Sequence, residues 1–341
     1  MPHPDAASER AMLTSIKEVF GVREGVRTVI CGPLYHAMPN VHARTALGSL
    51  GQDGLVVIEP RFDPERLLQL IHEHRITQLM LVPVMFIRLL RLPESVKRKY
   101  DTSSLEWVIH AAAPCPFEVK KAMIEWWGPV IYEFYGTTET GAVTMVGSQE
   151  YLKRPGTVGQ PARGCTVKIL DEEGREVPTG KEGEICAINP FYPDFVYRNL
   201  PEERAKLDRN GLIATGDIGY FDSEGYLYLC DRKKDMVISG GVNIYPAEIE
   251  GVLHSLPGVG DCAVFGVPDD EFGEAVAAHI ELVPGTPLGE REIRSYLSER
   301  LANFKVPKVI RFEERLPRDE NGKIYKRHLA EPYWRGTGRR I

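Results

Sequence analysis

The sequence predicts an α/β protein: a parallel sheet with helices, a β-rich subdomain and a small α+β C-terminal domain. Three observations lead to this prediction. Apolar runs of strand length alternate with helical patterns over residues 1–155, and short alternating runs separated by turn clusters fill residues 156–233. Both kinds of pattern return over residues 235–341. A chain of 341 residues is long enough for two or three such parts.

The first part carries the pattern of a parallel sheet covered by helices. Asp63-Pro64 predicts a helix start, because Asp caps a helix and Pro suits its first position. Residues 116–127 predict another helix, which Gly128 ends. Strands are expected between such helices, at residues 28–31, 77–82, 107–113 and 130–134.

The pattern of apolar and turn residues changes in the later parts of the chain. Turn clusters at residues 171–174, 178–180 and 222–225 separate short strands in the β-rich section. Beyond it, Pro246 opens a helix that we expect to end at Gly258. The apolar positions of this helix recur at helical spacing, at Ile249, Val252, Leu253 and Leu256. A strand at residues 262–267 and a helix at residues 293–301 are expected to follow.

Composition and charge exclude several classes of protein. Lys and Arg total 42 against 48 Asp and Glu, a net charge of -6, whereas a nucleic-acid surface needs a concentrated positive field. No run reaches the roughly 18 apolar residues of a membrane span, and no signal sequence opens the chain. The six cysteines show no metal-ligand spacing and are interpreted as buried, reduced thiols. We expect a cytoplasmic protein without a membrane span or a nucleic-acid partner.

Two common nucleotide motifs are excluded. Neither Gly-Lys pair in the chain is followed by Ser or Thr, so the Walker A motif is absent. Residues 258–263 match the relaxed dinucleotide pattern G-x-G-x-x-A. They follow a predicted helix and enter a predicted strand, the reverse of the order that dinucleotide binding requires.

The segment Tyr135–Gly141 is a stronger candidate. It places glycine, three hydroxyls and the carboxylate of Glu139 directly after a predicted strand. Such a turn can offer backbone N–H groups and hydroxyls to phosphate, while the carboxylate holds a divalent cation. The alternative is a capped turn that opens a helix, with Thr as the cap and Glu in the first turn. The spacing alone does not separate these interpretations.

Three further segments carry weaker signals. Asp217, on a predicted tight turn, could accept both hydroxyls of a ribose, although such turns are common. The run Asp231–Asp235, followed by Ser239-Gly240-Gly241, is either a solvated linker or a joint near phosphate. Lys323, after Asn321-Gly322, is either an exposed side chain or a cation that reaches another domain's cleft.

Taken together and in this order, the four motifs resemble those of the adenylate-forming acyl-activating superfamily. Its members include acyl-CoA synthetases, aryl-CoA ligases and luciferases. The most specific stretch runs from Thr215-Gly216-Asp217 through Asp231–Asp235 to Asn243–Glu250, and the similarity extends from about Gly32 to Tyr333. The chain is most similar to bacterial fatty-acid or aryl-CoA ligases.

The resemblance implies a two-step reaction. A small-molecule carboxylic acid attacks the α-phosphate of ATP, with Mg²⁺ bound, to give an acyl-adenylate and pyrophosphate. The thiol of CoA then displaces AMP. Because a carboxylate is a weak nucleophile facing an anionic phosphate, such catalysis must position both groups and cancel charge.

The resemblance also implies a role for individual residues. The catalytic residues would be Lys323, which bridges the carboxylate and the α-phosphate, Thr138, which contacts that phosphate, and Glu139, which holds Mg²⁺. Tyr135 would stack on adenine. The full set of nucleotide-binding residues would be Ala112, Ala113, Tyr135, Gly136, Thr137, Asp217 and Arg232.

Further roles concern the acid, CoA and domain movement. His36 would lie at the entrance of the acyl pocket. Lys234 would be the hinge about which a mobile C-terminal domain rotates between the half-reactions, and Gly240 and Gly241 would then face CoA.

One feature of the family has no counterpart here. The Ser/Thr/Gly-rich loop ending in Lys, which wraps the β- and γ-phosphates, is not found between Met1 and Gly32. We therefore expect a ligase shortened upstream of its phosphate loop, or else a non-catalytic nucleotide-binding or scaffold paralogue with the same fold. One face of the parallel sheet would then lie uncovered and favour a homo-oligomer.

Overall fold

The computed structural model describes residues 6–318 and 324–335, with side chains from residue 9 onward. The chain divides into two compact units. The first comprises the chain up to Thr215 together with Gly219–Leu229, and the second comprises Gly216–Ile218 with the chain from Cys230 onward.

The first unit begins with a parallel sheet, as the sequence predicts. Its strands are paired in the order β2-β1-β3-β4-β5. Apolar residues on both faces suit a strand covered on both sides, and β3 is buried throughout. The strands span Arg27–Ile30 (β1), Leu55–Ile58 (β2), Gln78–Leu81 (β3), Trp107–His110 (β4) and Ile131–Thr137 (β5).

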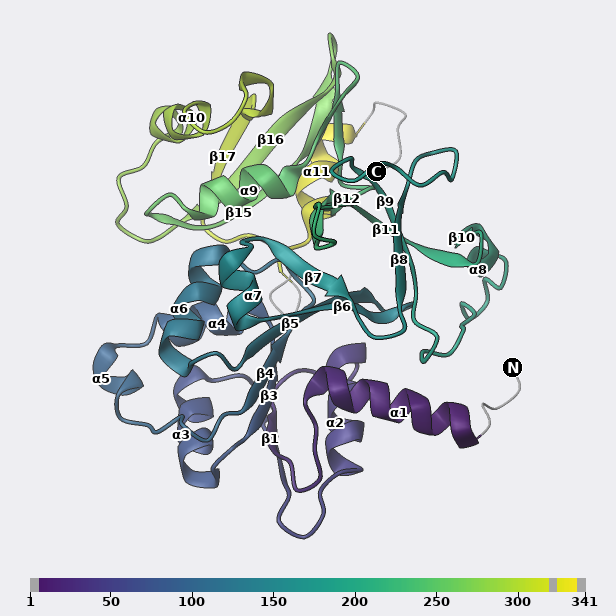
Figure 1. Cartoon of the computed structure of the whole chain (residues 1–341). Helices are drawn as coiled ribbons and strands as arrows, with labels where there is room; N and C mark the ends of the chain where they lie inside the picture. Colours follow the sequence, from purple (N-terminus) through teal and green to yellow (C-terminus); the bar gives the residue numbers. More distant parts are fainter. Residues whose placement is uncertain (1–5, 319–323, 336–341) are drawn as a thin grey trace. The chain divides into compact units, whose positions relative to one another are not determined.

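Helices lie on both faces of this sheet (Figure 1). On one face, α3, α4 and α6 pack into a core with the strands, and α1 and α2 cover the other face. These helices are α1 (Ala6–Phe20), α2 (Ala37–Leu47), α3 (Pro64–His74), α4 (Pro83–Leu90) and α6 (Phe117–Trp127). The short helices α5 (Glu94–Lys97) and α7 (Ser148–Lys153) complete this region.

The predicted helix ends of this region are confirmed. The Asp63 carboxylate accepts a hydrogen bond from the backbone N–H of Arg66 at 2.8 Å and caps α3. Gly128 follows α6 with a φ of 85°, a conformation that glycine adopts without strain.

The expectation that one face of the sheet lies uncovered is wrong. Val19 and Phe20 of α1 and Ala46 of α2 are buried against Met80 and Ile109, which point to that face. The residues before β1 fold into a helix with an apolar side, and this helix supplies the cover. The predicted homo-oligomer therefore loses its stated reason.

The sheet continues with antiparallel strands, in the order β5-β6-β7-β12-β11-β9-β8, with β10 paired to β11. This arrangement agrees with the predicted β-rich section. The strands are β6 (Gly141–Gly147), β7 (Thr157–Pro161), β8 (Thr166–Leu170), β9 (Gly183–Ile188), β10 (Asp208–Arg209), β11 (Leu212–Phe221) and β12 (Leu227–Arg232), and the short helix α8 spans Glu203–Lys206. Hydrogen bonds close the predicted turns, such as Gly225 N–H to Asp222 O at 3.1 Å.

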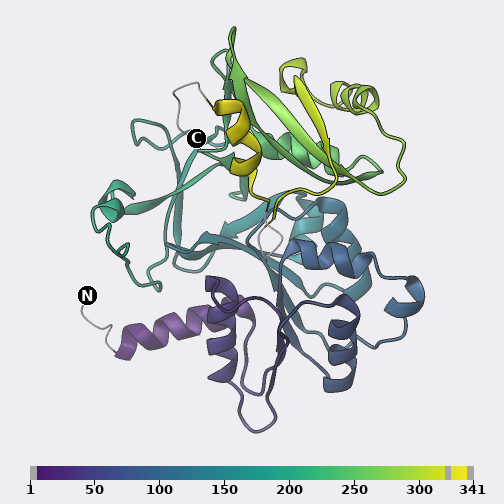
Figure 2. The same cartoon turned by 180° about the vertical axis from the view of Figure 1, so that it is seen from behind.

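The second unit is an α+β domain. Its sheet has the order β15-β16-β17, with α9 and α10 on one face and α11 on the other (Figure 2). The elements are β15 (Val259–Asp269), β16 (Gly273–Leu282), β17 (Val309–Glu313), α9 (Pro246–His254), α10 (Glu290–Ser298), α11 (Lys326–Trp334) and the 3₁₀ turn η1 (Asn303–Lys305). A two-stranded hairpin, β13 (Val237–Ser239) and β14 (Val242–Ile244), precedes them.

Helix α9 is shorter than expected. It ends at His254, with Ser255 as its C-cap, rather than at Gly258. Leu256 N–H and Val259 N–H bond in separate turns to Leu253 O and Leu256 O, so the chain turns before the glycine is reached. Leu256 still packs on the core, which explains why it fits the apolar pattern of the helix.

All six cysteines lie among the described residues and carry free thiols. Cys31, Cys186 and Cys262 are buried, as expected, whereas the other cysteines are half-buried. Within residues 6–318 and 324–335, no helix is long and apolar enough to cross a membrane.

Candidate functional site

The segment Tyr135–Gly141 forms a β-hairpin. Residues Tyr135–Thr137 belong to β5, Gly141 begins β6, and Thr137 pairs with Gly141. The alternative of a capped turn that opens a helix is therefore wrong. The Glu139 side chain stands at the tip of the hairpin and is half-buried.

Two hydroxyls of this turn form hydrogen bonds within the turn. Thr137 Oγ1 accepts hydrogen bonds from the backbone N–H groups of Glu139 and Thr140, each at 3.2 Å. Thr140 Oγ1 accepts from Thr137 N–H at 3.1 Å, and Thr140 is 1% exposed. These backbone N–H groups, which the sequence suggested for phosphate, are thus already bonded. Thr138, by contrast, is exposed and can reach a ligand.

At the start of the segment Tyr135–Gly141, strands β5 and β6 approach each other closely. A Cβ at Gly136 would lie 1.9 Å from the carbonyl oxygen of Gly141, so only glycine fits there. Tyr135 is 7% exposed and packs in the core of the β-rich region. Its hydroxyl donates to Thr215 Oγ1 at 3.0 Å, which fixes the ring. Only a small part of the Tyr135 surface is open to a ligand.

Ala112 and Ala113 follow β4, the strand next to β5, and both are exposed. Ala112 has a φ of 74°, in the left-handed region that a residue with a Cβ rarely adopts. Strained backbone of this kind tends to occur where a site needs it. The structure thus places both alanines at the same end of the parallel sheet as the hairpin, because parallel strands end at the same edge.

A buried charged cluster lies on β4 and β5, before Ala112 and the hairpin turn in the sequence. Lys120 Nζ donates to Glu133 Oε2 at 2.6 Å, and His110 Nε2 lies 3.8 Å from the same oxygen. Burial, and secondarily the charge of Lys120, hold the pKa of His110 well below its usual value, so its imidazole is neutral. No short motif predicts this cluster, because its members come from three separate elements, β4, β5 and α6.

Asp217 lies in the middle of strand β11, so the predicted tight turn is wrong. The chain stays extended around it, and Gly216 takes up the local distortion with a φ of 75°. The Asp217 carboxylate is nearly buried, and its Oδ1 lies 3.2 Å from Arg232 Nε. The structure therefore brings the two residues together.

An open hollow of about 360 Å³ adjoins this pair in the second unit. It is lined by Gly216, Arg232, Lys233 and Lys234. The backbone N–H of Lys233 donates to Gly216 O at 2.9 Å, which joins β11 to the turn after β12. The side chains of Lys233 and Lys234 are exposed, so the hollow combines positive charge with access from solvent.

The remaining predicted residues lie in turns. Gly240 and Gly241 form the tip of the β13–β14 hairpin, with φ values of 58° and 81° that favour glycine. Gly240 N–H donates to Phe272 O at 2.9 Å. His36 precedes α2 and is half-buried, with its ring 4.5 Å from that of Tyr35.

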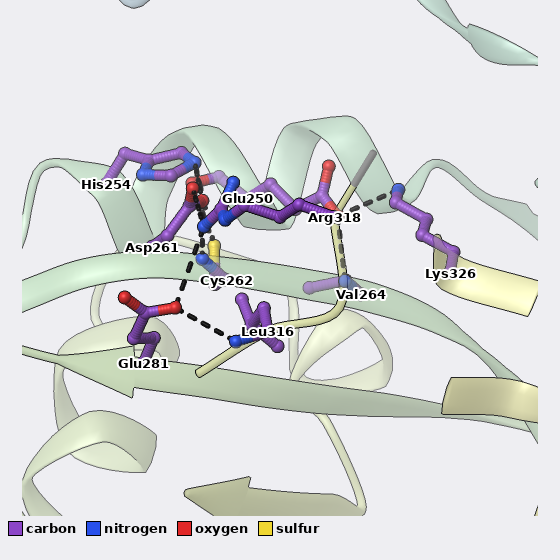
Figure 3. Close-up of polar contacts among 9 residues, drawn as sticks. All are labelled: Glu250, His254, Asp261, Cys262, Val264, Glu281, Leu316, Arg318 and Lys326. Carbon is purple, nitrogen blue, oxygen red and sulfur yellow. Dashed lines mark hydrogen bonds and ion pairs between the residues drawn. The ribbon is translucent and has the colours of Figure 1, made fainter. Parts of the chain in front are cut away.

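Lys323 lies outside the described residues, but the residues on both sides of its segment are held by ion pairs (Figure 3). Arg318 Nη2 contacts Asp261 Oδ2 at 2.5 Å and Glu281 Oε2 at 3.7 Å. Lys326 Nζ contacts Glu250 Oε1 at 2.8 Å. Arg318 and Ile324 also form an isolated β-bridge.

Burial alone would lower the pKa of Lys326. Glu250 and Asp231 outweigh that effect, so the pKa is raised and the side chain is charged. Asp231 belongs to the charged run beside the predicted hinge, and it accepts a hydrogen bond from Ala247 N–H at 2.8 Å. Acidic residues of two elements, α9 and β12, thus stabilise this cation.

Sequence reasoning missed Tyr197. Its hydroxyl donates to Glu139 Oε1 at 2.8 Å, across 58 residues of sequence. No short motif announces the contact, because the segment from β9 to α8 looks like an ordinary connection. Only the aromatic residues clustered in it, Phe191, Tyr192, Phe195 and Tyr197, could have drawn attention to it.

Comparisons with known proteins point to one family of enzymes. Residues 2–192 match the family described as AMP-binding enzyme, and residues 248–323 match the AMP-binding enzyme C-terminal domain. The chain is 34% identical over 325 residues to the medium/long-chain-fatty-acid–CoA ligase FadD8 of Mycobacterium tuberculosis. That match covers 92% of this chain but 56% of the relative, so the chain spans little more than half of the length of FadD8.

Solved structures give the same result. ATP-bound MatB from Rhodopseudomonas palustris aligns with a TM-score of 0.86 and 31% identity, covering 97% of this chain and 65% of that one. O-succinylbenzoate coenzyme A synthetase (MenE) from Bacillus subtilis, in complex with ATP and magnesium ion, aligns with a TM-score of 0.81 and 30% identity. It covers 95% of this chain and 65% of that one.

Proposed function

The chain belongs to the family of AMP-binding enzymes, and from this membership we propose that it is an AMP-forming acyl-CoA ligase. The reaction converts a carboxylic acid, ATP and CoA into acyl-CoA, AMP and diphosphate. The names of relatives such as FadD8 support a ligase of this class.

One observation carries the proposal: the nearly buried carboxylate of Asp217 stands beside the hollow lined by Arg232, Lys233 and Lys234. A nucleoside monophosphate carries hydroxyl donors on its ribose and negative charge on its phosphate. An acceptor carboxylate next to several cations matches both. Asp217 would accept the ribose hydroxyls, with Arg232 holding it in place.

The hairpin of the first unit would act on the phosphates. Thr138, the exposed hydroxyl of the turn, would donate to the α-phosphate, and Glu139 would offer carboxylate oxygen to Mg²⁺, a cation that prefers such ligands. When bound, Mg²⁺ neutralises charge on the phosphate oxygens. Ala112, Ala113, Gly136 and Thr137 would shape the nucleotide pocket beside Tyr135.

The roles of the second unit follow from the resemblance. Lys323 would bridge the acid's carboxylate and the α-phosphate, after which rotation at Lys234 would replace it with the side that carries Gly240 and Gly241, for CoA. We propose a hydrophobic acid as the substrate, with His36 at the pocket entrance. Residues 82–86, at the start of α4, are apolar, and Val82, Val84 and Met85 among them are only half-buried.

The test is pyrophosphate release with a panel of carboxylic acids. Lys323→Ala should lower the rate by about 10²–10³-fold if this ammonium group is a preorganised charge in the transition state. Lys308→Ala is the matched control, because Lys308 is an exposed lysine of the same unit that pairs with Asp269. Equal rates in the two variants would contradict the role of Lys323.

A second candidate function is nucleotide binding without ligation. It is favoured by one observation: the backbone N–H groups of Glu139 and Thr140 already donate to Thr137 Oγ1, which leaves the turn fewer donors for phosphate. The two candidates differ in outcome. Binding of AMP by calorimetry without pyrophosphate release from any acid supports the second, and release supports the first.

Oligomeric state and location are proposed separately. The edge strand β2 exposes 59% of Ile58, and exposed strand edges can pair with a second copy, so we propose a homo-oligomer. A monomer by light scattering would contradict this. The free thiols support a cytoplasmic location, which cell fractionation tests.

A further inference from the structure

The long connection between β9 and α8 lies against the hairpin that carries Glu139. We name this connection, together with the first two residues of α8, the strap (residues 189–204). Asn189 Nδ2 donates to Ala142 O at 2.9 Å, and the ring of Tyr192 packs so closely on Gly141 that a Cβ there would lie 2.6 Å from it. The Tyr197 hydroxyl then donates to Glu139 Oε1 at 2.8 Å. The strap thus contacts the β5–β6 hairpin at three places, at Ala142, Gly141 and Glu139.

The position of Tyr197 is fixed from within the strap. Its ring packs edge-on against Phe195, with 5.3 Å between ring centroids. The Arg204 guanidinium lies 5.3 Å from the Phe195 ring centroid and pairs with Asp194 at 2.8 Å. These contacts orient the Tyr197 ring so that its hydroxyl faces Glu139.

The hydrogen bond from Tyr197 occupies one oxygen of the Glu139 side chain. A carboxylate has two oxygens, and Tyr197 contacts only Oε1. Among the described residues, Oε2 of Glu139 has no hydrogen-bond or ion-pair partner.

Such an arrangement is expected to strengthen the binding of a divalent cation. Mg²⁺ requires near-octahedral geometry, so the orientation of a carboxylate ligand matters to its affinity. Groups that hydrogen-bond to a ligating carboxylate orient it, and their loss typically weakens metal binding. Because the Tyr197 hydroxyl bonds to Oε1 of Glu139, it orients the carboxylate and leaves Oε2 available to a cation.

We propose that Tyr197 is a positioning residue for Glu139: it holds Oε1 so that Oε2 can bind the divalent cation of a metal–nucleotide complex. This inference rests on the proposed function, in which Glu139 binds Mg²⁺. It assigns to the strap a part in nucleotide binding that its sequence does not suggest.

The experiment measures ATP affinity by calorimetry twice, once with Mg²⁺ and once with EDTA, in the full chain. The ratio of the two affinities is the gain due to the metal. Tyr197→Phe should lower this gain by about tenfold and leave the affinity in EDTA unchanged. Tyr100→Phe is the matched control, because it removes a tyrosine hydroxyl that donates to a glutamate of the same unit outside the hairpin, Glu65 Oε1 at 3.0 Å, and it should keep both affinities. Glu139→Gln should abolish the gain.

The outcomes separate this inference from the proposed function. If Glu139→Gln loses the gain while Tyr197→Phe keeps or increases it, the inference is wrong and the proposed metal role of Glu139 stands. If Tyr197→Phe lowers the affinity equally with Mg²⁺ and with EDTA, its role is structural and the inference is also wrong. If the unaltered chain shows no gain, or Glu139→Gln retains it, the metal role fails and the inference fails with it.

Discussion

At the scale of single residues, Ala112 combines an exposed position with a left-handed backbone. A Cβ in that conformation costs about 1 kcal/mol, which glycine avoids. We predict that Ala112→Gly keeps or raises the free energy of unfolding, by up to about 1 kcal/mol. Ala113→Gly is the control, because Ala113 is not among the residues of positive φ, and it should lower stability by about 0.5–1 kcal/mol. Urea unfolding measures both; equal losses would show that the Ala112 backbone carries no strain.

His42 makes stability depend on pH. Its Nε2 lies 2.6 Å from Gln78 Oε1, while Gln78 Nε2 donates to Phe20 O at 2.8 Å, so the imidazole donates through Nε2–H. Its Nδ1 is buried without a partner among the described residues. Burial, opposed by the bond to Gln78, lowers the pKa of His42 from 6.5 to about 4.

Because the folded protein holds this imidazole neutral, the unfolded chain binds the proton more readily. The contribution of His42 to stability is complete above pH 6.5 and is lost as the pH falls toward about 4. The full loss is about 3 kcal/mol, at 1.36 kcal/mol per pKa unit. Unfolding free energies at pH 7.5 and 5.0 test this: the difference should be smaller in His42→Gln. An identical pH dependence in the variant would contradict the prediction.

Single residues also show which parts of the candidate site could be predicted from the sequence. Thr138 and Glu139 could be proposed as site residues from a local pattern of hydroxyls and carboxylate, since they lie in one turn. Tyr197 and His42 could not, because their partners Glu139 and Gln78 come from distant segments that only the fold brings close.

At the scale of elements, local patterns predicted the start of α3 and the extent of α6. Asp63 before Pro64 marks the start of α3 whatever surrounds it. The hairpin at Tyr135–Gly141 and the strand around Asp217 were harder, because hydroxyls, glycine and acidic residues suit turns, caps and strand ends alike. Pairing decided both: Tyr135 pairs with Thr144, and β11 lies between β12 and β9. Such pairing has no local signature.

Helix α9 carries two glutamates that allow a matched comparison. Glu250 pairs with Lys326 and accepts a hydrogen bond from Val264 N–H at 2.7 Å, and its side chain is 18% exposed. Glu248 pairs with Lys305 at a more exposed place. We predict that Glu250→Gln lowers the stability of the second unit by about 1–2 kcal/mol, since a partly buried charge loses its partner. Glu248→Gln should cost about 0.5 kcal/mol or less.

Hydrogen exchange of the β15 amides measures this difference, because β15 packs directly on α9. Protection should fall more in Glu250→Gln than in Glu248→Gln. Equal protection in the two variants would mean that the Lys326 ion pair adds no more than a surface pair.

At the scale of the whole molecule, the sequence predicts the classes of its parts better than their connections. The parallel order of β1 and β3–β5 follows from strand–helix alternation. The return of β12 to pair with β7, across the strands β8–β11, does not follow from any segment. The cover of the sheet by α1 and α2 was likewise missed, because the expectation there came from the family resemblance and not from the apolar residues of those helices.

The central claim is that the Asp217–Arg232 pair, beside the hollow that Lys233 and Lys234 line, binds adenosine monophosphate. Calorimetric titration with AMP tests it most directly, in the unaltered chain, in Asp217→Asn, and in Asp269→Asn as a control that alters an exposed ion pair of the same unit. We predict saturable binding, weakened about tenfold or more by Asp217→Asn, since charged hydrogen bonds contribute about 1.5–3 kcal/mol, and unchanged by Asp269→Asn. No binding of AMP at high protein concentration, or equal affinity in Asp217→Asn and the unaltered chain, would contradict the claim.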